Sequence, residues 1–130
     1  MKEEQLELIH QAEENLLGSL LIAGTDGTTE AIDAVKRIVK PDDFLPTYHM
    51  GRNKRIYEGM IAAPKTDQLS VANAMWDNQT LQQGDIPYMC HLVAETITSL
   101  DYDIYAHIVS DLAKEWRTGT KGKARFKGAI

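Results

Sequence analysis

The sequence holds only one cysteine, Cys90, so no disulfide can form within the chain and a reducing cytoplasm is the expected location. It also lacks any apolar run of the ~18 residues that a membrane span needs, because Gly18 and Ser19 interrupt the longest candidate. A Gly-Lys-Ser or Gly-Lys-Thr step occurs nowhere, which excludes a complete P-loop ATPase. We therefore expect a cytoplasmic protein with no membrane partner and no nucleotide hydrolysis of its own.

The composition is that of one soluble globular domain. The chain has 130 residues, of which 43% are apolar and 25% are charged, and this length suffices to bury a core without a metal or disulfides. We place the domain at residues 1–117. Residues 118–130 contain three glycines and a single aromatic side chain, a composition typical of a flexible tail or linker stub.

Charge is distributed unevenly along the chain. The net charge is −5, but the tail holds four of the fourteen Lys and Arg and none of the nineteen Asp and Glu, so residues 1–117 carry −9. A body this acidic repels nucleic-acid phosphate. DNA is expected to bind weakly at most, and only through the basic residues of the tail, which are Lys121, Lys123, Arg125 and Lys127.

Apolar residues recur at steps of three and four through most of the chain, and no strand-like alternation is found. This pattern predicts helices over about 3–23, 29–39, 52–63, 69–76, 85–97 and 103–116. The fold class is therefore all-α, and the last two helices are expected to form an antiparallel helical hairpin joined by a tight turn at Ser99 to Asp101. Gly18 lies inside the first helix, where it indicates close approach by a second helix.

No catalytic, cofactor or metal site is predicted. Cys90 and His91 are adjacent, so on a helix they point about 100° apart and cannot easily hold one ion. Cys90 could in principle pair with His49 or His107 as a nucleophile, but we expect it to be buried beside Met89. The histidines share no metal-ligand spacing; they are His10, His49, His91 and His107.

Two groups of residues are candidates for binding. Arg52, Lys54 and Arg55 could contact phosphate or an acidic partner, although a solvated helix face explains them as well. The predicted hairpin carries more apolar surface than one helix pair can cover, and its aromatic residues either form a stripe for a partner or pack on the rest of the domain. Those aromatic residues are Tyr88, Tyr102, Tyr105 and Trp116.

Five short motifs follow one another in a fixed order along residues 6–117. They are Gln11-Ala12-Glu13-Glu14-Asn15-Leu16-Leu17-Gly18-Ser19-Leu20-Leu21, Pro41-Asp42-Asp43-Phe44, Ile56-Tyr57-Glu58-Gly59-Met60, Asp67-Gln68-Leu69-Ser70-Val71-Ala72 and Tyr105-Ala106-His107-Ile108-Val109. Their order and spacing resemble the N-terminal domain of the DnaB-type replicative DNA helicases.

The resemblance implies a small globular helical head at about 4–82 and a helical hairpin at about 86–117. In that family these domains form the collar of the helicase hexamer and receive primase or a helicase loader, while ATP and Mg belong to a separate ATPase domain of the full-length protein. The implied head core is Leu16, Leu17, Leu20, Leu21, Ile32, Val35, Ile56, Tyr57 and Met60. The expected hairpin and pairing face is Tyr88, Leu92, Tyr105, Ile108, Val109, Leu112 and Trp116.

Two classes of function remain open. In the first, the chain is a non-catalytic assembly and docking domain of a replicative helicase, with self-association into a dimer or into a hexamer collar. In the second, it is a free-standing adaptor or inhibitor from a phage or mobile element that binds a host helicase or primase. The basic tail favours the second class slightly, because a helicase linker would more often continue as a helix.

Overall fold

The computed structural model describes residues 2–96 and 101–118, and within these ranges all regular structure is helical. The all-α prediction is confirmed. The α-helices are α1 (Glu3–Thr25), α2 (Glu30–Lys36), α3 (Arg52–Ala62), α4 (Gln68–Asp77), α5 (Asp85–Glu95) and α6 (Tyr102–Thr118), with two short 3₁₀ helices, η1 (Pro41–Asp43) and η2 (Tyr48–Gly51). None of the described helices combines the length and hydropathy that a membrane span requires.

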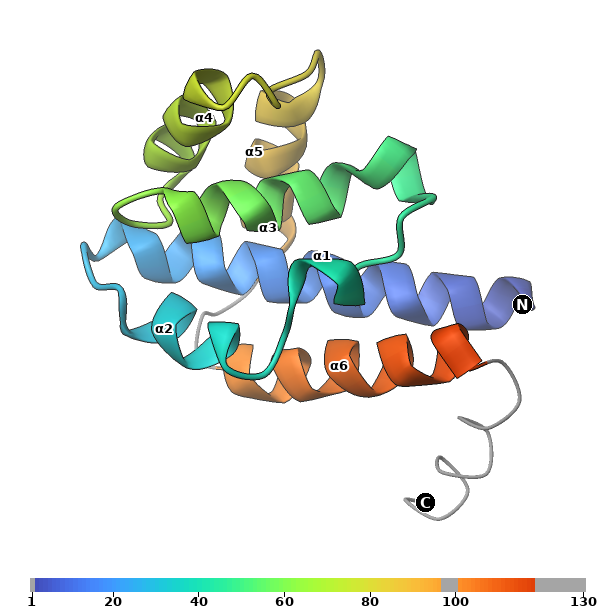
Figure 1. Cartoon of the computed structure of the whole chain (residues 1–130). Helices are drawn as coiled ribbons and strands as arrows, with labels where there is room; N and C mark the ends of the chain where they lie inside the picture. Colours follow the sequence, from blue (N-terminus) through green and yellow to red (C-terminus); the bar gives the residue numbers. More distant parts are fainter. Residues whose placement is uncertain (1, 97–100, 119–130) are drawn as a thin grey trace.

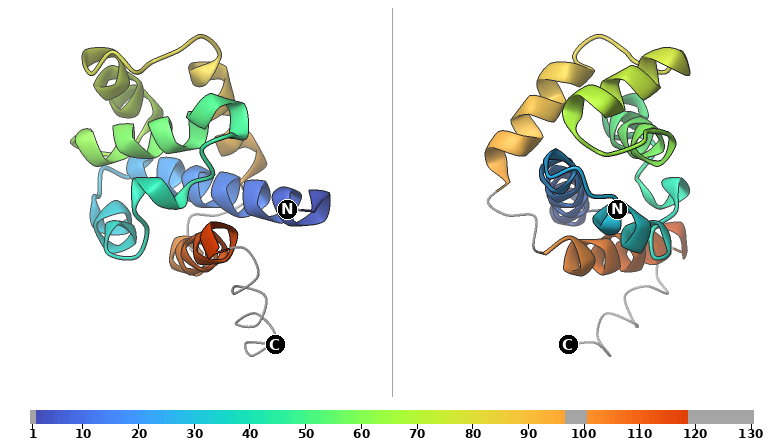
Figure 2. Two further views of the ribbon diagram at one scale, coloured as in Figure 1. Left: turned by 45° about the vertical axis from the view of Figure 1, so that its right-hand side comes forward. Right: turned by 90° about the vertical axis from the view of Figure 1, so that its left-hand side faces the viewer.

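Helix α1 forms the centre of the molecule. Figures 1 and 2 show α3 above it, α6 below it and α5 against a third side, and α1 packs against all three. Helix α4 packs on α3 and lies at the far end of the molecule from α6. The central place of α1 follows from its sequence, because two adjacent pairs of leucines, Leu16–Leu17 and Leu20–Leu21, spread apolar surface around more than one side of a helix.

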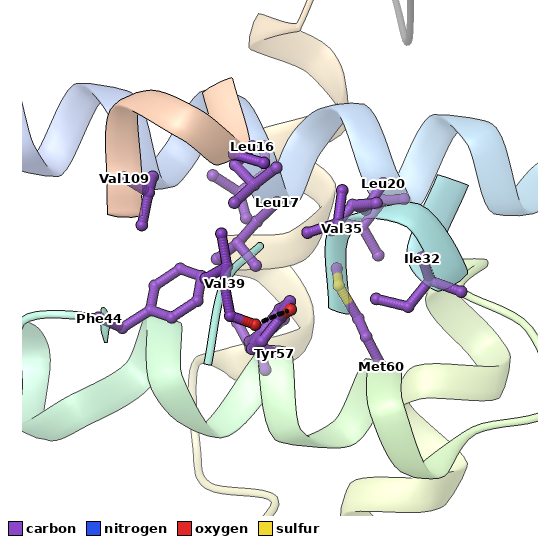
Figure 3. Packing of buried hydrophobic residues seen from close by; sticks show 14 of the residues in the cluster. Leu16, Leu17, Leu20, Ile32, Val35, Val39, Phe44, Tyr57, Met60 and Val109 are labelled. Atoms are coloured by element: carbon purple, nitrogen blue, oxygen red, sulfur yellow. Dashed lines mark hydrogen bonds between the residues drawn. The ribbon is translucent and has the colours of Figure 1, made fainter. Parts of the chain in front are cut away.

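The core lies between α1, α2 and α3, with a contribution from α6 (Figure 3). The Tyr57 ring lies inside it, and the Tyr57 hydroxyl donates a hydrogen bond to the Val39 carbonyl at 2.7 Å, so the one polar atom of this side chain is satisfied. Every residue of the predicted head core is buried. The prediction for this core is therefore confirmed.

Gly18 allows α5 to approach α1 closely. A Cβ atom built on Gly18 would lie 1.9 Å from the Thr96 hydroxyl oxygen and 2.9 Å from the Leu92 carbonyl oxygen. Both distances are shorter than van der Waals contact, so a larger residue would force the two helices apart. The predicted close approach is confirmed, and the second helix is α5.

Helices α5 and α6 differ from the predicted hairpin arrangement. They lie on different sides of α1, and α6 packs on α1, α2 and η1 instead of along α5 (Figures 1 and 2). The physical reason is that an amphipathic stripe shows that a helix buries one face but does not name the helix that covers it. The predicted turn at Ser99 to Asp101 falls mainly on residues 97–100, which lie outside the described residues.

Candidate protein-docking surfaces

Three residues of the expected pairing face are buried in the core of a single copy of the chain. Val109 is only 1% exposed and lies near Phe44 in the core (Figure 3), and Leu92 and Leu112 are buried as well. These side chains cover α1 within a single copy, since α5 and α6 each pack on that helix. The structure corrects the prediction for Leu92, Val109 and Leu112, which are core residues and are not available to a partner.

The other members of that face on α6 reach the surface. Ile108 is exposed, and Tyr105 and Trp116 are half-buried. Ile104, one turn before Ile108, is 54% exposed, so the two isoleucines form a short apolar row on the outside of α6. The Trp116 indole Nε1 is buried and has no hydrogen-bond partner among the described residues, which makes its position costly for a lone chain.

Tyr88 of α5 makes two contacts with side chains of α3. Its hydroxyl donates a hydrogen bond to Asn53 Oδ1 at 2.6 Å, and the Arg52 guanidinium lies 5.3 Å from the centre of its ring. The side chain is half-buried. Tyr88 therefore connects α5 to α3, and whether it also meets a partner stays a prediction.

The basic residues of α3 already have acidic partners within the chain. Arg52 and Arg55 both pair with Asp85, at 3.0 and 2.5 Å, and Asp85 is fully buried. The Asp85 carboxylate also accepts a hydrogen bond from the Gln82 N–H. Asp85 is the first residue of α5, so these contacts fix the start of that helix.

Lys54 pairs with Asp42 at 2.9 Å. Arg52 and Arg55 are thus engaged by a buried carboxylate, whereas Lys54 and Asp42 form an ion pair at the surface. Contact of these three cations with an external anion stays a prediction. The basic residues of the tail lie outside the described residues.

Helix α4 presents a surface that sequence analysis did not single out. Leu69 is 70% exposed and Trp76 is 72% exposed, and the polar residue Asn73 lies between them on the same exposed face. The spacing of i, i+4 and i+7 places the three side chains in one row, with a large apolar side chain at each end. The signal was present in the sequence, because Val71 and Met75 already fill the buried face of this short helix, which leaves the two large apolar side chains on a second face without a cover.

Cys90, the nucleophile candidate, lies at the surface of α5. Cys90 is exposed, which contradicts the expected burial, and its thiol donates a hydrogen bond to Gln68 Oε1 at 3.1 Å. Among the described residues, no three His, Cys, Asp or Glu side chains are grouped to hold a metal ion. A shallow polar hollow of about 230 Å³ lies between α1 and α5; its lining residues are Gln11, Glu14, Asn15, His91, Leu92, Glu95 and Thr96.

Glu13 is a buried carboxylate that sequence analysis passed over. Its side chain is 1% exposed, and its two oxygens accept hydrogen bonds from Asn53 Nδ2 at 2.9 Å and from the Leu45 N–H at 2.8 Å. Burial raises the pKa of this carboxyl to about 7, while these two hydrogen bonds act to lower the pKa and the neighbouring Glu14 raises it. Glu13 stands at an apolar position of the helical pattern, four residues after Ile9 and four before Leu17, and this was the signal that could have marked it.

Comparison with known proteins decides the family. The model of the DnaB-like helicase N terminal domain matches residues 5–111. The chain belongs to this family. The crystal structure of the N-terminal domain of DnaB helicase from Mycobacterium tuberculosis has the same fold, with a TM-score of 0.65 over 78% of this chain and 68% of that chain at 24% identity. None of the curated protein sequences matches the chain.

Three of the five motifs have a clear structural role in this DnaB-family fold. Gly18 gives α5 its close approach, Pro41 to Asp43 form η1, and Ala106 and Val109 are buried against the head. These motif residues therefore serve the packing of the helices. Residues 5–111 are the N-terminal domain of a DnaB-like replicative helicase.

Proposed function

We propose that this chain is a non-catalytic assembly and docking domain, which holds helicase subunits together in a collar and offers the collar to a primase or a helicase loader. The observation that carries the proposal is the pair of exposed rows, Leu69 to Trp76 on α4 and Ile104 to Ile108 on α6. Large apolar side chains that are exposed on one face are typical of protein interfaces, and tryptophan is enriched among residues that dominate binding energy. In this proposal the domain uses no cofactor, and ATP hydrolysis resides in another domain of the helicase.

The position of the two rows supports a ring. Helices α4 and α6 lie at opposite ends of the molecule, with α3 and α1 between them (Figures 1 and 2). Two different two-fold contacts, one through each row, let copies alternate around a closed ring with an even number of members. A single row would allow only dimers. The two rows together therefore fit a hexamer collar built from dimers.

Sedimentation velocity over a concentration series tests this proposal. We expect the wild type to associate weakly, because each row is short and specific interfaces usually bury on the order of 1,200 Å² or more. Trp76→Ser and Ile108→Glu should each stop the association at a dimer, and the double variant should remain a monomer. Leu8→Ser changes an exposed apolar residue outside both rows and serves as the control. A wild type that stays monomeric near millimolar concentration, or a double variant that associates like the wild type, contradicts the proposal.

A further inference from the structure

Three side chains from three helices form a continuous hydrogen-bond chain. Tyr88 of α5 donates its hydroxyl proton to Asn53 Oδ1 at 2.6 Å, and Asn53 of α3 donates from Nδ2 to Glu13 Oε1 of α1 at 2.9 Å. The second Glu13 oxygen accepts the Leu45 N–H. Glu13 and Asn53 are buried, so water does not replace these bonds. In this arrangement every donor points toward the Glu13 carboxylate.

We propose that Glu13, Asn53 and Tyr88 act as a proton-coupled chain that transmits the protonation of Glu13 to helix α5. The proposal is independent of the assembly function. It rests on the amide of Asn53, which has a donor on one side and an acceptor on the other and can exchange them by turning half a revolution. The protonation state of Glu13, at the buried end, therefore sets the direction of all the hydrogen bonds in this series.

Protonation of Glu13 would reverse the direction of each hydrogen bond between Glu13, Asn53 and Tyr88, and every atom and proton is accounted for in this reversal. One proton from solvent joins Glu13 Oε1, and the carboxyl changes from an acceptor to a donor at that oxygen. Asn53 turns its amide so that Oδ1 accepts this new O–H, and Nδ2 then donates to the Tyr88 hydroxyl oxygen. The Tyr88 hydroxyl proton turns away from Asn53. The Leu45 N–H keeps its bond to the other Glu13 oxygen throughout.

The relevant pH range lies near neutrality, because burial raises the pKa of the Glu13 carboxyl to about 7. This value includes the negative charge of Glu14, which raises the pKa, and the hydrogen bonds from Asn53 and Leu45, which lower it. The Tyr48 hydroxyl donates to Glu14 at 2.8 Å, and the Tyr48 ring stacks on His10 with the ring centres 3.6 Å apart. The titratable groups that interact electrostatically with Glu13 are Glu14 of α1, Tyr48 of η2 and Tyr88 of α5. Other charged or titratable groups on the elements around this part of α1 include His10, which stacks on Tyr48, Arg52, which lies over the Tyr88 ring, Asp43 of η1, which pairs with Arg117 of α6, and Asp111 of α6.

The hydrogen-bond series ends at Tyr88, in the first turn of α5. Tyr88 lies one turn after Asp85, which holds this end of α5 to α3 through Arg52 and Arg55, and the Arg52 guanidinium also lies over the Tyr88 ring. A change in the direction of the Tyr88 hydroxyl therefore acts where α5 is attached to the head. Protonation of Glu13 in α1 therefore changes a side-chain contact of another helix, α5.

Nuclear magnetic resonance titration of the whole chain tests the proposal. With the glutamate carboxyl carbons labelled, we expect one carboxyl resonance to move with a midpoint near pH 7 and to be absent in Glu13→Gln. The side-chain amide protons of Asn53 should shift with the same midpoint. Glu13→Gln places an amide donor at this position, so its Asn53 resonances should match the low-pH wild type at every pH.

Three further variants separate the causes. In Tyr88→Phe, Asn53 should still respond to pH while the backbone amides of α5 no longer do. Glu14→Gln should lower the midpoint without uncoupling Asn53 from Glu13. A transition near pH 7 that persists in Glu13→Gln and vanishes in His10→Gln belongs to His10 and overturns the proposal. So does a Glu13 carboxyl that titrates while the Asn53 amide stays unchanged.

Discussion

Gly18 of α1 and Thr96, the residue that follows α5, occupy a contact that leaves no space for a side chain at position 18. A Cβ atom there would lie 1.9 Å from the Thr96 hydroxyl oxygen, which is less than two-thirds of an ordinary contact distance. The hydroxyl itself donates to the Leu92 carbonyl at 2.7 Å, so it is held at the position where the clash occurs. The fit between α1 and α5 therefore depends on this glycine.

Gly18→Ala should destabilise the domain by about 1–3 kcal/mol through overpacking, although alanine favours a helix by about 1 kcal/mol. The free energy of unfolding in urea measures this. In the double variant with Thr96→Ala, the loss should become smaller, because the atom at 1.9 Å is removed and only the Leu92 carbonyl oxygen at 2.9 Å and the Cβ of residue 96 at 3.0 Å remain close. An alanine variant as stable as the wild type would show that α1 and α5 separate at no cost.

Substitution by aspartate should affect the free energy of unfolding very differently at two adjacent residues of α6. Val109→Asp places a charge at a position that is buried in the core, so it should unfold the domain or cost at least ~3 kcal/mol. Ile108→Asp changes an exposed side chain and should leave the free energy of unfolding within about 0.5 kcal/mol of the wild type. Circular dichroism during urea unfolding distinguishes them. Equal losses at both positions would contradict the placement of α6 on α1.

Asp85→Asn should be strongly destabilising, because it leaves Arg52 and Arg55 without a carboxylate in a region of little water. Removal of one partner from a buried ion pair costs about 3–5 kcal/mol, and both arginines pair with this one residue. Asp77→Asn, at the exposed end of α4, is the matched control. A similar and small loss in both variants would mean that water replaces the Asp85 carboxylate.

Glu13 should make the domain less stable as the pH rises toward neutrality. Its folded pKa of about 7 exceeds the ordinary value of 4.5, so folding favours the protonated form. The contribution is fully present below pH 4.5 and is lost between there and pH 7. It amounts to roughly 3 kcal/mol at about 1.4 kcal/mol per pKa unit.

Unfolding of Glu13→Gln and the wild type across this range measures the contribution. The stability of the variant relative to the wild type should increase from pH 4.5 to pH 7 and then level off. Glu58→Gln, on the exposed side of α3, controls for the loss of a carboxylate. A difference that is independent of pH would place the ionised Glu13 in a solvated environment.

The sequence was sufficient for the six α-helices and for the head core, although α2 ends at Lys36 and the 3₁₀ helices η1 and η2 were not predicted. Leu16, Leu17, Ile56 and Tyr57 were identified as buried, because helical spacing and repeated leucines constrain which face turns inward. Periodicity cannot say which helix covers which. For that reason Val109 was expected at an interface, although it packs inside the chain beside Phe44.

Charged and polar residues were harder to place than apolar ones. Arg52 and Asp85 are more than thirty residues apart in the sequence, and nothing local indicates that they meet. Trp76 was assigned to a helix without a decision about its face, since α4 carries large apolar side chains on both sides. Long-range pairing and the choice between two such faces are properties of the tertiary structure, which single-sequence patterns do not contain.

In the proposed assembly, copies of this domain meet through the rows on α4 and α6. Amide spectra of the ¹⁵N-labelled wild type, recorded at increasing protein concentration, test it residue by residue. We expect the resonances of Leu69 to Asp77 and of Asp103 to Ile108 to shift or broaden together, while those around Asp85 and Tyr57 stay in place. Shifts confined to other surfaces, or spectra that do not change with concentration, would contradict it.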